Sequence, residues 1–232
     1  MRYERYFERM TGRNDGRRIS SAKVLMIGAG LLGCETAEAL VARGIRHFVI
    51  FDPSSVNFRD VDGSRFRPED VGSRYAAEIT AARLVSLGAS CTYQIANVRR
   101  IDGWNYEAVL CCNASYGDRM AANLRVRQYD LALVDGVVSG KRGRIQSVIP
   151  NGPCLGCLVT ARSAADPGPS QPSAVSAVAE IMADEAIKMV TGRMYECTPG
   201  VIHVENGHKV ILNTGISPAC PFHRDGKMRK LQ

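Results

Sequence analysis

Short apolar runs alternate with longer amphipathic stretches along the first 140 residues of the chain. A short apolar run is typical of a buried strand, and apolar positions three or four apart are typical of one face of a helix. This pattern predicts strands at 23–27, 47–52, 91–96, 108–112 and 131–135, with helices at about 31–43, 71–87 and 118–129. Strands and helices that alternate in this way form an α/β fold, a mostly parallel sheet with helices on both faces. A ligand should then bind at the carboxyl ends of the strands.

The pattern changes beyond residue 140, where we predict a strand at 143–149, a helix at 173–191 and a hairpin of strands 200–205 and 208–213. The hairpin turns at Asn206-Gly207, a pair that tolerates the positive φ angles of a tight turn. Three prolines within 165–173 predict a mobile loop. We expect one domain over 1–232, with a ligand-binding half at about 20–140 and a C-terminal β portion at about 141–225.

Three glycines follow directly after the first predicted strand, with the spacing G-x-G-x-x-G: Gly28, Gly30 and Gly33. Such glycines allow a tight turn, close approach of the backbone to phosphate and close helix packing. Asp52 ends the second strand, nineteen residues after Gly33. An acid at that position accepts a hydrogen bond from a ribose hydroxyl in Rossmann-like folds. The combination predicts a nucleotide site, and NAD, FAD, S-adenosylmethionine and ATP all remain open.

Two pairs of soft metal ligands lie far downstream, each with a two-residue gap: Cys154 with Cys157, and Cys220 with His223. Each pair can bind one ion from a single turn, and two pairs complete a tetrahedron of the kind that holds Zn²⁺. Four protein ligands leave no position for water, so the predicted zinc is structural and joins the chain end to the main domain. The alternative is two unrelated pairs, with Cys154 and Cys157 as a redox dithiol.

The composition of this 232-residue chain limits the cellular compartments and the classes of partner that we expect. Its hydrophobic content of 45% supports a sizeable core, yet no apolar run reaches the roughly 18 residues that span a membrane. The charged N-terminus is unlike a signal peptide, so eight cysteines indicate a reducing cytoplasm rather than a disulfide framework. The net charge of +7 favours an acidic partner, such as a nucleotide phosphate or an acidic peptide or protein. The basic residues are scattered, which disfavours nucleic acid.

The order of these motifs resembles that of the ThiF/MoeB/HesA superfamily of ATP-dependent adenylyltransferases, over Arg2 to about His223. Such enzymes bind ATP over the glycine loop, and the C-terminal carboxylate of a small protein or peptide attacks the α-phosphate. The resemblance implies a homodimer that makes an acyl-adenylate and pyrophosphate from a ubiquitin-like or sulfur-carrier protein, or from a precursor peptide. The segments that carry it are Arg2-Tyr-Glu-Arg5, Gly28-Ala-Gly-Leu-Leu-Gly33, Asp52, Asp70-Val-Gly72, Arg119-Met-Ala-Ala-Asn123, Gly143-Arg-Ile145, Pro153-Cys-Leu-Gly-Cys157, Asp184-Glu-Ala-Ile-Lys188 and the Cys220/His223 pair.

The resemblance also implies roles for individual residues. Asp52 would hold the ribose, and either Arg59 or Arg65 would be the catalytic arginine that the family places after this acid. Arg59, which follows Asn57-Phe58, is the closer match to the family's Asn-Leu-x-Arg, although the spacing is one residue short. Arg74 lies about where the family has a phosphate-binding lysine. Arg5 resembles the arginine that reaches across the dimer to the partner's nucleotide. These cations, together with Mg²⁺, would offset the repulsion between a carboxylate and ATP.

One departure from the family concerns magnesium. The family has Thr-Asp-Asn after the fourth strand, and its Asp helps to bind Mg²⁺, whereas this chain has Ala114 at the position of the acid. Asn113 still offers an oxygen, and Asp118 or Asp135 could supply the charge. The alternatives are an altered metal dependence or impaired adenylation.

A second departure concerns thioester chemistry. Ubiquitin-activating enzymes carry a nucleophilic cysteine in the segment after the first zinc pair, but residues 158–182 contain none. This favours acyl-adenylation followed by transfer to an external nucleophile, with Cys197 as the remaining thioester candidate. The competing functions are a peptide natural-product maturation enzyme of the same superfamily, a nucleotide-binding but inactive scaffold, and an NAD- or FAD-dependent oxidoreductase.

Overall fold

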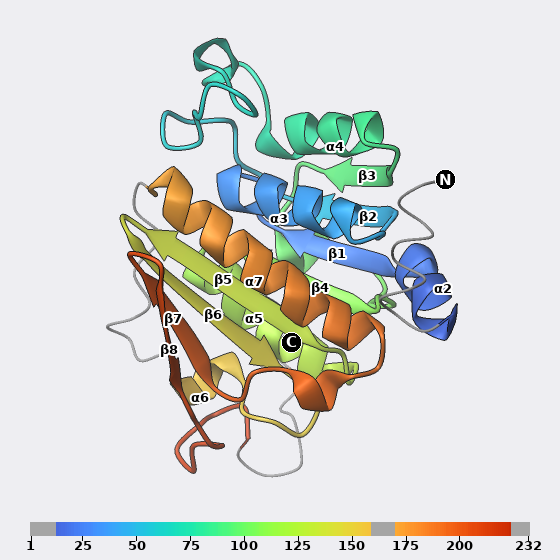
Figure 1. The fold of residues 1–232 in the computed structure, drawn as a ribbon, viewed down its shortest axis with the longest axis vertical. Coiled ribbons are helices and arrows are strands. Elements are labelled where there is room, and N and C mark those ends of the chain that lie inside the picture. Colours follow the sequence, from blue (N-terminus) through green and yellow to red (C-terminus); the bar gives the residue numbers. More distant parts are fainter. Residues whose placement is uncertain (1–12, 159–169, 224–232) are drawn as a thin grey trace.

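The structure is a computed structural model that describes residues 13–158 and 170–223. Its centre is one eight-stranded sheet in the order β3-β2-β1-β4-β5-β6-β7-β8 (Figure 1). The strands are β1 (Lys23–Ile27), β2 (His47–Phe51), β3 (Ser90–Gln94), β4 (Ala108–Cys112), β5 (Leu133–Ser139), β6 (Arg142–Val148), β7 (Val201–Glu205) and β8 (His208–Leu212). The helices are α2 (Arg13–Ser21), α3 (Leu31–Ala42), α4 (Ala76–Ser86), α5 (Tyr116–Gln128), α6 (Leu155–Leu158) and α7 (Pro172–Val190), with short 3₁₀ turns η1 (Pro68–Asp70), η2 (Val98–Arg100) and η4 (Met194–Glu196).

Strands β3, β2, β1, β4 and β5 are parallel, as the alternating pattern predicts. Strands β6, β7 and β8 then extend the same sheet in antiparallel fashion. The predicted C-terminal β portion is therefore a continuation of the same sheet as the parallel strands. The β7–β8 turn has positive φ at Asn206 (50°) and Gly207 (79°), which confirms the predicted hairpin.

Helices cover both faces of the sheet, and each face has its own apolar core. Helices α3, α4 and α7 pack on one face, and α5 lies behind the sheet in Figure 1. Close packing of α7 depends on glycine, because a Cβ at Gly136 would meet Met182 and one at Gly143 would meet Val178. Strand β1 is buried on both sides, which explains why its sequence is continuously apolar.

Several predicted boundaries are wrong. The helix predicted at 71–87 begins only at Ala76, because Gly72 has a φ of 69° that a helix does not accommodate. The strand predicted at 131–135 runs from Leu133 to Ser139, since β5 continues into the turn before β6. Helix α2 was not predicted, because its sequence is dominated by polar and charged residues. The loop expected at 165–173 lies largely outside the described residues.

Within the described residues, no helix is both long enough and apolar enough to cross a membrane.

A buried ion pair lies in the protein interior. The guanidinium of Arg119 on α5 donates to both carboxylate oxygens of Asp135 on β5, at 2.7 and 2.5 Å. Arg144 on β6 donates to the same carboxylate at 3.1 Å. Removing Asp135 would leave the buried charge of Arg119 without its carboxylate, and removing Arg119 would leave Asp135 with Arg144 alone, so this pair fixes α5 on the sheet.

Candidate functional site: a nucleotide cavity and a Cys/His cluster

The glycine loop between β1 and α3 has the tight geometry that its sequence predicts. Gly28 has a φ of 95°, and a Cβ at this position would meet the carbonyl oxygen of Cys112. A Cβ at Gly33 would likewise meet the carbonyl oxygen of Gly28. Glycine at these two positions therefore lets β1, the loop and α3 pack closely. The first turn of α3 then lies at the carboxyl end of β1, where its backbone N–H groups attract an anion.

Asp52 follows β2 and lies beside the glycine loop. One carboxylate oxygen accepts a hydrogen bond from the backbone N–H of Ala29 at 2.6 Å, and the other accepts one from Ser54 at 2.8 Å. The side chain is buried, so these two hydrogen bonds compensate the lost solvation of the carboxylate. Each oxygen keeps lone pairs that a ligand hydroxyl can use.

A cavity of about 290 Å³ opens at this edge of the sheet. Its wall combines the ends of β1, β2 and β4 with the first turn of α3 and the segment after β2. The residues that line it are Ile27, Gly28, Gly30, Leu31, Leu32, Phe51, Asp52, Pro53, Ser54, Asn57, Arg59, Asp60, Ala76, Asn97, Cys112, Asn113, Ala114, Ser115, Asp118, Ser170 and Val175. Five residues predicted from sequence thus meet at one cavity: Gly28, Gly30, Asp52, Arg59 and Asn113.

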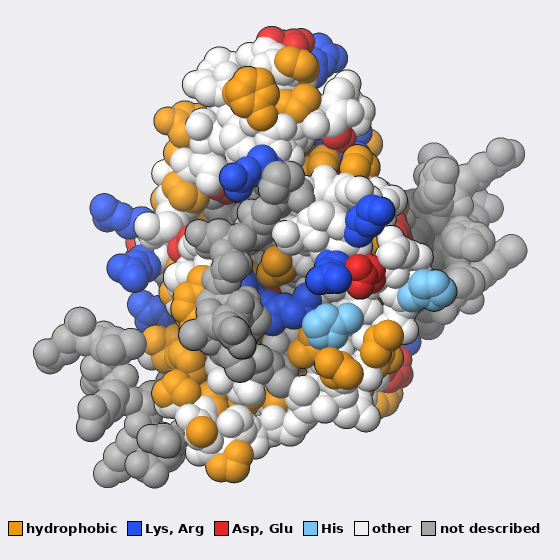
Figure 2. Space-filling model, turned by 90° about the vertical axis from the view of Figure 1, so that its left-hand side faces the viewer, with side chains coloured by type: hydrophobic (Ala, Val, Ile, Leu, Met, Phe, Trp, Pro, Cys, Tyr) orange, Lys and Arg blue, Asp and Glu red, His pale blue; other side chains and the backbone are white. Residues whose placement is uncertain are grey.

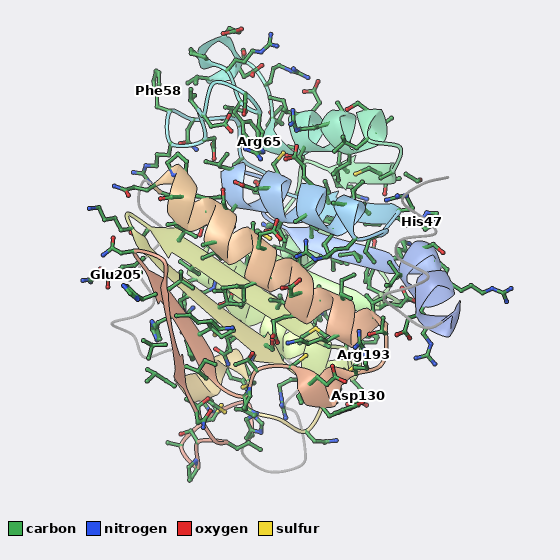
Figure 3. The ribbon with its side chains drawn as sticks, viewed as in Figure 1. His47, Phe58, Arg65, Asp130, Arg193 and Glu205 are labelled. Carbon is green, nitrogen blue, oxygen red and sulfur yellow. The ribbon has the colours of Figure 1, made fainter. Side chains whose placement is uncertain are left out.

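Three of the four arginines named from sequence lie within the described residues, and their surroundings differ. Arg59 lines the nucleotide cavity, and its side chain has no ion pair within residues 13–158 and 170–223. Arg65 pairs with Glu38 at 2.9 Å and with Asp62 at 3.0 Å, and it lies near Glu35. Figure 3 shows Arg65 beside α3, below the loop that carries Phe58.

Arg74 is also engaged by acids, Asp70 at 3.6 Å and Glu78 at 3.0 Å. Arg65 and Arg74 both line a second cavity of about 360 Å³, together with Arg67 and Arg83. The structure therefore brings only Arg59 of the three to the glycine loop. Arg5 lies outside the described residues.

The residues predicted as magnesium ligands also differ in whether they line the cavity. Asn113 has a φ of 50°, and its side-chain oxygen accepts a hydrogen bond from the backbone N–H of Val138 at 2.7 Å. Asp118 lines the cavity and accepts a hydrogen bond from the hydroxyl of Ser115 at 2.8 Å. Asp135 is fully buried against two arginines and does not line the cavity. Ala114 lines it without any oxygen ligand in its side chain.

Asp60 is a cavity residue that sequence reasoning missed. Its carboxylate is half-buried beside the glycine loop, and burial followed by the charge of Asp52 raises its pKa. Asn57 and Ser54 line the cavity as well. The signal that could have found Asp60 is its place directly after Arg59, in the segment that follows Asp52.

The four predicted zinc ligands lie together near the C-terminus. The sulfur atoms of Cys154, Cys157 and Cys220 and a ring nitrogen of His223 lie within 4.8 Å of one another. The Sγ of Cys154 is 3.9 Å from that of Cys157 and 3.6 Å from that of Cys220. Two sulfurs bound to one tetrahedral zinc, each at about 2.3 Å, are roughly 3.8 Å apart. The cluster therefore has the spacing and the donor set of a tetrahedral metal site.

Other groups support this cluster. The Nε2 atom of His223 is buried and has no hydrogen-bond partner, which is the state of a nitrogen that faces a metal position. The side-chain oxygen of Asn123 on α5 accepts a hydrogen bond from the backbone N–H of Leu155 at 3.0 Å. A Cβ at Gly156 would meet the ring of Phe222, so glycine lets the two ligand turns approach.

Cys197 does not have the properties of a nucleophile. Its side chain is buried, and burial raises the pKa of its thiol to about 12, with the charge of Glu185 acting in the same direction. A thiol with this pKa is protonated at neutral pH, whereas the thiolate is the reactive form. The structure thus removes the support for a thioester at Cys197.

Two curated proteins are similar in sequence to this chain over most of its length. The SAMP-activating enzyme E1 of Haloferax volcanii is 25% identical over 188 residues, which cover 75% of this chain and 68% of that protein. The sulfur carrier protein ThiS adenylyltransferase of Bacillus subtilis is 25% identical over 201 residues, covering 81% of this chain and 59% of that protein. The chain thus spans about six to seven tenths of these relatives.

Solved structures share the fold. E. coli MccB with MccA-N7isoASN matches with a TM-score of 0.79 at 14% identity, covering 96% of this chain and 74% of that chain. E. coli MccB with ATP matches with a TM-score of 0.74 at 15% identity, covering 90% and 68%. Residues 3–213 match the ThiF family, which is nearly the whole chain. This protein therefore belongs to the ThiF family.

Proposed function

We propose that this protein is an ATP-dependent adenylyltransferase. It activates the C-terminal carboxylate of a ubiquitin-like or sulfur-carrier protein, or of a precursor peptide, to an acyl-adenylate. The observation that carries the proposal is one cavity that combines the glycine loop, the buried Asp52 and Arg59, which has no ion pair within residues 13–158 and 170–223. Membership of the ThiF family favours ATP over the nicotinamide and flavin cofactors that a glycine loop alone would accept.

Each part of the cavity has a role in nucleotide binding. The oxygens of Asp52 would accept hydrogen bonds from ribose hydroxyls, because each still has a free lone pair. The N-terminal turn of α3 would bind phosphate through backbone N–H groups and the positive end of the helix dipole. Gly28 and Gly30 permit this approach because neither has a side chain of its own that would block the backbone N–H groups.

The chemistry requires a cation at the cavity. A carboxylate oxygen of the partner attacks the α-phosphorus, the bond between this phosphorus and the bridging oxygen breaks, and pyrophosphate leaves. Negative charge builds up on the oxygens of the reacting phosphorus. Arg59 would stabilise that charge, since it lines the cavity and makes no ion pair within 4 Å to a carboxylate of the described residues. Arg65 and Arg74, which are paired with acids, then serve the structure of the loop.

Magnesium ligands would come from oxygens that line the same cavity. Asp118 is the acid nearest in sequence to Ala114, and it lies at the start of α5. The side-chain oxygen of Asn113 accepts one hydrogen bond and has a second lone pair. Carboxylate and carbonyl oxygens suit Mg²⁺, which would neutralise part of the triphosphate charge.

We also propose that Cys154, Cys157, Cys220 and His223 bind one Zn²⁺ in a structural site. The spacing of the sulfurs and the unpartnered His223 nitrogen support this ion. Four protein ligands leave no open position for a substrate. The ion would join the segment after β8 to α6 and so fix the end of the chain to the sheet.

The partner is a protein or peptide with a free C-terminus. Figure 2 shows Lys and Arg side chains at several places on one face and few Asp or Glu side chains, consistent with the net charge of +7 and an acidic partner. The likeness to E. coli MccB over 96% of this chain favours a precursor peptide as the second candidate. The protein would be a homodimer in which Arg5 of each subunit reaches the nucleotide of its partner. It would act in the cytoplasm.

Mass spectrometry of candidate partners tests this function. After incubation with ATP and Mg²⁺, the partner should carry one AMP on its C-terminal carboxylate, and hydroxylamine should convert this adduct to a hydroxamate. The same partner with a C-terminal amide should gain no AMP. Binding of ATP without any adduct on any candidate partner would support the inactive scaffold instead.

A further inference from the structure

The carboxylate of Asp60 contacts the glycine loop at the N-terminus of α3. Its Oδ1 atom is so close to Gly30 that a Cβ on this glycine would be 2.6 Å away. The carboxylate also interacts with the backbone N–H of Leu31, the first residue of α3. A negatively charged group at a helix N-terminus is stabilised by the helix dipole and by the free N–H groups. Helix α3 has no acidic residue in its own first turn, so Asp60 supplies this charge from another segment.

A tight turn holds Asp60 in this position. Its second oxygen accepts hydrogen bonds from the backbone N–H of Asn57 at 3.1 Å and from the side-chain amide of Asn57 at 2.7 Å. The backbone N–H of Asp60 in turn donates to the carbonyl of Asn57 at 3.0 Å. The turn contains Arg59, whose backbone N–H donates to the Asn57 side chain at 2.9 Å. The orientation of the carboxylate is therefore determined by the same turn that carries the proposed catalytic arginine.

The carboxylates of Asp52 and Asp60 thus both interact with the glycine loop. Only Asp52 is suited to bind a group of ATP, because hydroxyls donate hydrogen bonds to a carboxylate and phosphates do not. Asp52 binds Ala29 and remains suited to ribose hydroxyls. Asp60 contacts the loop at Gly30 and Leu31, where an acceptor oxygen of phosphate would compete for the same N–H group. A carboxylate and a phosphate in this cavity also repel each other, because both are negatively charged and solvent is partly excluded.

We propose that Asp60 occupies the phosphate position of the glycine loop in the nucleotide-free protein and must leave it when ATP binds. This inference rests on the proposed function, since it assumes that the cavity binds ATP. Asp60 then lowers the affinity for the phosphate chain and leaves the affinity for adenosine unchanged. Its release also frees the turn from Asn57 to Asp60, so that Arg59 can move with it toward the bound phosphates.

Calorimetry with adenosine, AMP and ATP, without Mg²⁺, tests this inference on the full-length protein. Asp60→Asn should bind ATP about tenfold more tightly than the wild type, the effect of removing one competing interaction with a charged group. Adenosine should bind equally to both proteins, and AMP should show an intermediate gain. Asp60→Ala should show the same order of gains in affinity, largest for ATP and none for adenosine. This result would exclude an effect of hydrogen bonds made by the amide of the Asn variant.

Glu69→Gln is the matched control, because Glu69 is an exposed acid of the same segment that lines the second cavity. Its ATP affinity should remain within about twofold of the wild type, since exposed charges interact weakly across solvent. Equal or weaker ATP binding by both Asp60 variants, with wild-type protein that binds ATP, would overturn this inference alone. An equal gain for adenosine would also overturn it. Failure of the wild type and all three variants to bind ATP, with Mg²⁺ present as well as without it, would reject the proposed function itself.

Discussion

Asp52 accepts a hydrogen bond from the backbone N–H of Ala29 at 2.6 Å, so the acid after β2 is linked directly to the glycine loop after β1. Replacing Asp52 with Ala should therefore remove the ribose acceptor and also loosen the loop. We expect ATP affinity to fall by about 1.5–3 kcal/mol, as for the loss of a hydrogen bond to a charged group. Calorimetry with ATP and with NAD measures this.

Asp102→Ala is a suitable control for the Asp52 variant, because Asp102 is exposed and does not line the cavity. Its ATP affinity should equal that of the wild type. Unchanged ATP binding by Asp52→Ala would contradict the assignment of the ribose acid. Tighter binding of NAD than of ATP by the wild type would favour the oxidoreductase.

Arg59 and Arg65 should respond differently to substitution. Arg59→Ala should lower the rate of adenylation by about 100- to 1000-fold with little change in ATP affinity, because the arginine acts mainly on charge that develops in the transition state. Arg65→Ala removes the ion-pair partner of Asp62 and one of the two arginines paired with Glu38, and should instead lower the free energy of unfolding by about 1–3 kcal/mol. Single-turnover kinetics and urea denaturation separate the two effects. A folded Arg65→Ala protein without adenylation activity would reverse the assignment.

Zinc should be present at one ion per chain in protein purified without chelators. Cys157→Ala should lower the zinc content and destabilise the segment after β8, whereas Cys91→Ala, a thiol outside the cluster, should change neither. Acid should release the ion, because zinc binds thiolates and competes with protons for them. Elemental analysis between neutral and acidic pH measures this. Wild-type protein without zinc would contradict the site.

Asp62 should contribute to stability in a defined pH range. Burial opposes its charge, but the backbone N–H groups of Phe66, Arg65 and Ser64 outweigh this effect and lower the pKa of Asp62 from 3.8 to about 2. A lowered pKa in the folded state means that the stabilisation is complete above pH 3.8 and is lost as the pH falls toward 2. By this linkage, the charged form adds about 2 kcal/mol.

Urea denaturation of the wild type and Asp62→Asn tests this contribution. The difference between their free energies of unfolding should be constant near neutral pH and should shrink between pH 3.8 and about pH 2. Glu69→Gln, an exposed acid of the same segment, should show a much smaller difference from the wild type. A difference for Asp62→Asn that does not change with pH would contradict the argument.

The sequence predicted the elements whose signal is local. Strands β1 and β4 are found at the predicted residues because both are continuous apolar runs that the sheet buries on two faces. The glycine loop and the Cys/His pairs were also predictable, since their spacing reflects geometry within one or two turns. The start of α4 was wrong because it depends on the path of the 53–75 segment, which has no periodic pattern.

The parts that could not be predicted depend on contacts between distant segments. The sequence leaves both Arg59 and Arg65 as candidates although Arg59 is the closer match, and only the fold shows that one lines the cavity while the other pairs with acids on α3. The position of Asp135 was equally unpredictable, because only the fold shows that its carboxylate is buried beside Arg119 and does not line the cavity. Asp60 has no recognisable motif, because its role follows from its position against Gly30.

Exchange of radiolabelled pyrophosphate into ATP tests the central claim most directly. The reaction should be seen only when a partner with a free C-terminal carboxylate is present, because the label enters ATP only through reversal of acyl-adenylate formation. The same partner with a C-terminal amide should give no exchange, and Arg59→Ala should reduce the rate by about 100-fold or more. Exchange that continues with the amidated partner, or that Arg59→Ala leaves unchanged, would contradict the proposed site and mechanism.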